Sequence, residues 1–187
     1  MASILDVLII ILDFVISVWN AYASGFNIGM LKKTRGKPSA FQEVSSYAGL
    51  GLAFVGMSYV LAIVLSFAGA SFGYIDPGTV DFILAFVFLV FGILIIGLGI
   101  IITIQSIIIA SQRKSVGNIL GVVWNAFAGA WDIYAYASGF KQSVDILRRE
   151  DRDRETDALI VIIVAVLISF FIVHAAYKHG YNKAIEM

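Results

Sequence analysis

The sequence predicts an all-α, polytopic integral membrane bundle of about five transmembrane helices, folded as a single transmembrane domain over residues 1–187. Two observations carry this prediction. Hydrophobic residues make up 60% of the chain and charged residues 14%, whereas soluble domains average about 25% charged residues. The chain also contains several apolar runs of about 20 residues, each long enough to cross the roughly 30 Å hydrocarbon layer.

Composition excludes several function classes. The formal net charge is zero, which argues against a nucleic-acid partner held through phosphate contacts. The chain has no Cys and two His, both near the C-terminus, so we expect no disulfide, no metal site and no cofactor. Motifs of serine hydrolases, phosphate-binding loops and zinc proteases are absent, so we expect no enzyme.

The first predicted span covers residues 4–31. The apolar run is followed by a basic segment that includes Lys32 and Lys33. A signal peptide would have a cleavage site of small residues there, so we expect this first span to be kept in the mature protein. Gly36 and Pro38 then form a helix stop signal.

The second and third predicted spans cover residues 45–70 and 80–110. A short turn separates them, in which Asp76 is a candidate N-cap and Pro77 occupies the first helical position. This order of residues predicts that the third helix begins at the turn.

The fourth and fifth predicted spans cover residues 116–140 and 158–178. Ser115 is a candidate N-cap for the fourth helix. Residues 141–157 form a mixed-charge loop between the two spans, part of which can extend a helix into solvent through i,i+4 charge pairs.

The distribution of Lys and Arg predicts the orientation. With five spans, eight of the 13 basic residues fall on one side and five on the other. Because basic loops stay inside the cell, we expect the N-terminus outside and the C-terminus in the cytoplasm. The eight are Lys32, Lys33, Arg35, Lys37, Arg113, Lys114, Lys178 and Lys183.

The first and fourth segments resemble each other. Ala21–Phe26 (AYASGF) recurs as Ala135–Phe140, and Trp19 and Trp131 precede the two copies. In a five-span chain the copies point in opposite directions, so we expect an inverted internal repeat, an architecture found in transporters. The alternative is a shared preference for small and interfacial aromatic residues.

A polar stripe runs along both segments. Asp6, Asp13, Asn20 and Asn27 recur every seven residues, with Ser17 and Ser24 between them, which is one seam of a helix. The fourth segment repeats the pattern. Its members are Asn118, Asn125 and Asp132.

We expect these stripes to face each other, because a carboxylate in mid-bilayer costs about 2.5–3.5 kcal/mol and should avoid lipid. Antiparallel packing would pair Asp6 with Asp132, Asp13 with Asn125, and Asn20 with Asn118. Two close carboxylates cannot easily both ionise, so one would hold a proton or share a cation.

The leading functional hypothesis is therefore a channel or carrier that binds or passes a small cation or proton between the two helices, within a homo-oligomer or a larger membrane complex. The candidate ion-pathway residues are Asp6, Asp13, Ser17, Asn20, Asn125 and Asp132.

The alternative is a non-catalytic structural or accessory membrane protein, either a subunit of a larger complex or a self-assembling coat; a membrane enzyme ranks third. In that case the polar stripe caps helices, lies in the interfacial belt or hydrogen-bonds between helices. Small residues allow close helix packing. The candidates are Ala21, Gly25, Gly29, Gly49 and Ala53.

Overall fold

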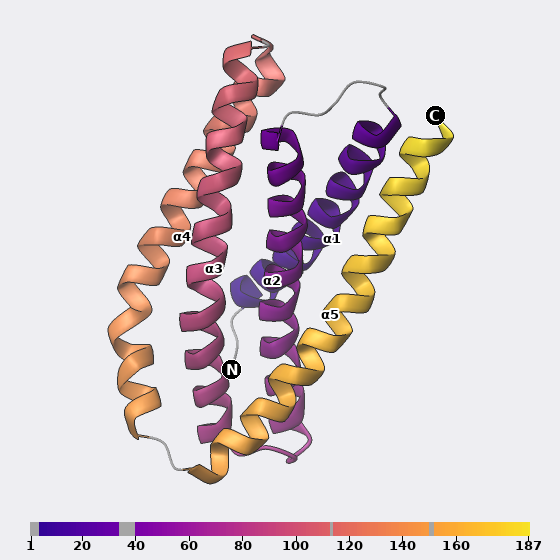
Figure 1. The fold of residues 1–187 in the computed structure, drawn as a ribbon. Helices are drawn as coiled ribbons and strands as arrows, with labels where there is room; N and C mark the ends of the chain where they lie inside the picture. The colour runs from indigo at the N-terminus through magenta and orange to yellow at the C-terminus, as the bar shows by residue number, and fades with distance from the viewer. Residues whose placement is uncertain (1–3, 34–39, 113, 150–151) are drawn as a thin grey trace.

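The computed structural model describes residues 4–33, 40–112, 114–149 and 152–187, and they form five α-helices without a strand (Figure 1). The prediction of an all-helical chain is confirmed. The helices are α1 (Ile4–Lys33), α2 (Ala40–Ser71), α3 (Pro77–Gln112), α4 (Val116–Arg149) and α5 (Arg152–Glu186).

The helices alternate in direction. The C-terminal end of α1, the α3–α4 connection and the chain's C-terminus lie together at the top in Figure 1, and the α2–α3 and α4–α5 connections lie at the bottom. The top end carries Lys32, Lys33, Lys114 and Lys183, and we call it the basic end. Arg35, Lys37 and Arg113, also predicted there, lie outside the described residues.

Four helices are long and apolar enough to cross a membrane. They are α1, α2, α3 and α5, over Val7–Lys33, Ser46–Ser71, Pro77–Gln112 and Arg154–Glu186. Among the described residues α4 does not meet the same standard, although it has 34 residues. Asn118, Asn125 and Asp132 lower its hydropathy.

α2 packs against α1, α3 and α5. Two apolar clusters lie along it. Towards the bottom of the bundle, α2, α3 and α5 enclose Ala62, Ile83, Val87, Ala158, Ile162 and Ala165. Towards the basic end, α1, α2 and α5 enclose Ala21, Ala53, Met57 and Val173.

α1 and α5 run parallel with their backbones in close contact. A methyl group added at Gly25 would overlap the carbonyl group of Tyr177, and one added at Gly180 would overlap the carbonyl group of Tyr22. One turn further on, a methyl group at Gly29 would lie 2.7 Å from the Ala184 Cβ. Glycine is therefore what allows this pair to approach so closely.

α4 lies at the outer edge of the bundle and, within the described ranges, packs only against α3 (Figure 1). The Tyr136 hydroxyl donates to the Leu89 carbonyl at 3.1 Å, and the Thr103 hydroxyl to the Asn125 carbonyl at 3.3 Å. The pairing 136 with 89 and 125 with 103 shows that the two helices are antiparallel.

The helix boundaries confirm the predicted caps. Asp76 accepts hydrogen bonds from the backbone N–H groups of Gly78 (2.8 Å) and Thr79 (3.2 Å), and α3 begins at Pro77. Ser115 accepts one from the N–H of Asn118 at 3.2 Å.

The predicted mixed-charge loop over 141–157 is mostly helical. α4 continues to Arg149 and α5 begins at Arg152, so the described residues of this stretch are helical. The alternating charges of this stretch support a solvated helix and do not interrupt it.

Candidate functional site

The two serines of the polar stripe of α1 face α2, whereas Asn27 of the same stripe is exposed. Ser17 and Ser24 are buried, and each opposes a glycine of α2. A methyl group at Gly56 would lie 2.8 Å from the Ser17 Oγ, and one at Gly49 would lie 2.7 Å from the Ser24 Oγ. Two serines seven residues apart thus pack against two glycines seven residues apart.

The expected packing of the first against the fourth segment is wrong, because α1 and α4 make no contact within the described residues. Instead, α1 packs against α2 and α5, and α4 packs against α3. The seven-residue period predicts a seam, but it does not specify which helix faces it.

Half-buried acids occur on both α1 and α4. Asp13 precedes Ser17 by one turn, and Ser17 opposes Gly56 of α2, so Asp13 lies at the level of Tyr59. Asp132 of α4 precedes Tyr136 by one turn, and Tyr136 bonds to Leu89 of α3. Asp13, Tyr59 and Asp132 come from three helices. The acid in the middle of α4 is therefore Asp132, one heptad from the Asn125 predicted from the sequence.

Neither acid is neutralised by a cationic side chain. In the described parts of the chain, Arg154 and Asp76 form an ion pair at 3.5 Å, outside the apolar layer. Neither Asp13 nor Asp132 takes part in an ion pair in these parts. No group of three or more His, Cys, Asp or Glu residues that could hold a metal ion occurs in the same ranges. Two carboxylates and a phenol hydroxyl offer hard oxygen atoms, which suit a proton or an alkali cation.

No hydrogen bond among the described residues joins the remaining predicted pathway residues to Asp13 or Asp132. Asn20 and Asn125 are half-buried, and the backbone carbonyl of Asn125 accepts the hydroxyl of Thr103. Ser17 belongs to the α1–α2 contact. The side chain of Asp6 lies outside the part that the structure describes.

The predicted packing residues all lie at helix contacts. Ala21 and Ala53 are fully buried in the cluster shared by α1, α2 and α5. Gly25 and Gly29 face α5, and Gly49 faces α1. Ser17 and Ser24 are buried against Gly56 and Gly49 of α2, so they also act as packing residues.

Sequence reasoning missed Tyr59 and Gly56. Tyr59 is one of several residues of α2 with a hydroxyl group, and nothing in the sequence distinguishes it from the others. Gly56 could have been found, because Gly49 and Gly56 have the same spacing as Ser17 and Ser24.

The family models, curated proteins and solved structures compared with the chain include no match. We therefore interpret the Asp13–Tyr59–Asp132 group, which we call the acid site, from its own chemistry.

Proposed function

We propose that this protein binds a small cation or proton at the acid site and passes it across the membrane, as a channel or carrier. One observation carries the proposal: two half-buried carboxylates, Asp13 of α1 and Asp132 of α4, lie within the apolar bundle, and no described cationic side chain forms an ion pair with either. Such a pair is costly in an apolar layer unless a proton or cation is shared.

The depth of the two acids supports this role. Asp13 follows the apolar residues at the start of α1, most of which are exposed as lipid-facing side chains are. Asp132 lies on α4 between Asn125 and Tyr136, which contact Thr103 and Leu89 of α3. Both acids therefore lie well inside the apolar lengths of α1 and α3.

The proposal requires α4 to cross the bilayer as a fifth span. Its residues 125–136 run beside residues 89–103 of the most apolar helix, α3, which supports placing α4 at the same depth. The excess of basic residues at the basic end supports the proposed orientation, with that end in the cytoplasm and the N-terminus outside.

The test measures proton, Na⁺ and K⁺ flux in liposomes. We expect Asp13→Asn and Asp132→Asn each to reduce flux at least tenfold, since each removes one oxygen charge from the site. Asp81→Asn is the matched control, because Asp81 is an exposed acid near the start of α3.

If both acid-site variants transport ions as fast as the wild type, the acid site has no role in transport. A wild type that transports none of the three ions would contradict the transport proposal itself. Circular dichroism of each variant separates loss of flux from loss of fold.

The second candidate is a structural or accessory subunit, favoured by the outward face of α4. Large apolar side chains there are at least 60% exposed in the single chain, as an interface with a second copy or another subunit would require. They are Trp124, Phe127, Trp131 and Tyr134. Phe127→Ser should then dissociate the assembly and leave the helical content unchanged.

A further inference from the structure

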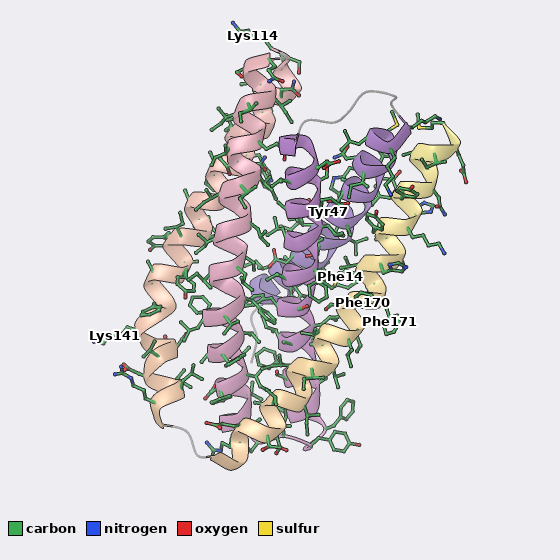
Figure 2. The ribbon with its side chains drawn as sticks, viewed as in Figure 1. Phe14, Tyr47, Lys114, Lys141, Phe170 and Phe171 are labelled. Atoms are coloured by element: carbon green, nitrogen blue, oxygen red, sulfur yellow. The ribbon has the colours of Figure 1, made fainter. Side chains whose placement is uncertain are left out.

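A groove between α1 and α5 lies on the face next to their glycine contact. It has a volume of about 410 Å³, and its walls are almost entirely apolar. Phe14, labelled in Figure 2, lies at the deep end of the groove. Tyr22 and His179 lie at its other end, which is nearer the basic end of the bundle. Val15, Val18, Trp19 and Ala176 form the walls between them.

The groove lies within the hydrocarbon layer and opens at the interface. The apolar part of α5, residues 158–177, is about 30 Å long at 1.5 Å per residue, which matches the layer. His179 is the second residue after this stretch, and its ring lies 5.8 Å from that of Tyr22. From Phe14 to Tyr22 the groove is about 12 Å long, which suits the upper part of an acyl chain.

Two lysine residues lie near the interfacial end of the groove. Lys183 lies one turn after His179, on the same side of α5. On α1, Lys33 donates to the Ile185 carbonyl at 3.2 Å, which holds its ammonium group against the end of α5.

We propose that this groove binds one anionic phospholipid, with an acyl chain along Phe14–Tyr22 and the phosphate at His179 and Lys183. The apolar walls fit the chain, while the imidazole N–H and the ammonium group can donate hydrogen bonds to phosphate oxygens. The aromatic rings of Trp19 and Tyr22 lie where interfacial aromatics contact the glycerol region. The site is separate from the acid site, so either proposal can fail alone.

The experiment measures lipid binding to the delipidated full-length protein by native mass spectrometry. Phosphatidylglycerol, phosphatidylcholine with the same acyl chains, and inorganic phosphate are compared. We expect phosphatidylglycerol to bind more tightly than phosphatidylcholine, and Lys183→Gln to weaken its binding about fivefold, the effect of one Lys beside an anionic headgroup. Val18→Trp, which fills the groove, should abolish the binding of both lipids.

Lys114→Gln is the matched control, because Lys114 is also at the basic end but at the tip of the α3–α4 connection (Figure 2). Equal binding of the two lipids would overturn the proposal, as would an equal effect of Lys114→Gln and Lys183→Gln. Full competition of inorganic phosphate with the lipid would also overturn the proposal. If Val18→Trp changed only the oligomeric mass, the proposal would fail as well, and the groove would be assigned to contact with a second copy of the chain.

Discussion

At the scale of single residues, Asp76 shows how one side chain joins two helices. It caps α3 through Gly78 and Thr79, accepts the Thr79 hydroxyl at 2.6 Å, and pairs with Arg154 of α5 at 3.5 Å. These contacts hold the pKa of Asp76 below its ordinary value. The hydrogen bond from the Thr79 hydroxyl lowers it most, and the backbone N–H groups of Thr79 and Gly78 and the charge of Arg154 lower it further. Asp76 follows the end of α2, so it connects the α2–α3 turn to the start of α5.

The lowered pKa predicts how stability depends on pH. A carboxyl group with a depressed folded-state pKa stabilises the fold fully above about pH 3.9, its unfolded value, and loses this effect as pH falls through the folded value. We expect Asp76→Asn, which keeps a capping oxygen but loses the charge, to lower the melting temperature in detergent at pH 7. The difference from the wild type should shrink as pH falls below about 3.9.

An equal difference at pH 7 and at pH 3 would show that the charge of Asp76 has no part in stability. Asp81→Asn serves again as the control, because Asp81 is an exposed acid on the same helix and should show no such pH dependence.

Several single residues could be predicted from the sequence, and others could not. Asp76, Pro77 and Ser115 form their caps because a cap depends only on residues three or four positions away. The partner of Asp13 could not be predicted, since it depends on how two distant helices tilt. One heptad of shift separates the predicted neighbour, Asn125, from Asp132.

At the scale of helices, glycine determines which pairs pack most closely. Gly25 and Gly180 each lie against the backbone of the opposite helix in the α1–α5 pair, whereas Gly97 of α3 has open space around it. In lipid the gain from packing comes from close contact, because burial from water contributes nothing.

This contrast predicts two opposite outcomes. Gly25→Ala should destabilise the fold by about 1–3 kcal/mol, since the added methyl group overlaps the Tyr177 backbone, which cannot move aside easily. Gly97→Ala should be neutral or slightly stabilising, because Ala has the better helix propensity. Unfolding in a mixed SDS titration measures both, and equal effects would contradict this account of the α1–α5 contact.

The two AYASGF segments show what a repeated sequence can and cannot predict about helix packing. Gly25 and Gly139 both lie at helix contacts, with Tyr177 of α5 and with Phe88 of α3 respectively. However, Ser24 is buried whereas Ser138 is exposed. The local sequence favours a close contact through glycine, while the neighbours in the bundle decide the environment of the serine. The inverted repeat itself stays a prediction.

At the scale of the whole molecule, the order of helices could be predicted and their neighbours could not. Short connections force the alternation of directions, so the two ends of the bundle follow from counting the helices. The outer place of α4 does not follow from the sequence, because a polar seam on α1 fits the glycines of α2 as well as it would fit α4.

The absence of Cys makes the topology directly testable. In intact cells we expect a membrane-impermeant maleimide to label Tyr74→Cys and Glu155→Cys, at the bottom end. Lys114→Cys, at the basic end, should react only after permeabilisation. Labelling of Lys114→Cys and Glu155→Cys from the same side would show that α4 does not span the membrane.

The most direct test concerns the acid site itself. The Asp13→Cys/Asp132→Cys protein, reconstituted in lipid, is treated with a short bifunctional thiol reagent and examined by intact mass. We predict a cross-link within one chain, and less of it in Asp13→Cys/Asn118→Cys, where Asn118 lies two heptads away. Cross-links that form only between chains, or form equally with Asn118→Cys, would contradict an Asp13–Asp132 pair inside this bundle.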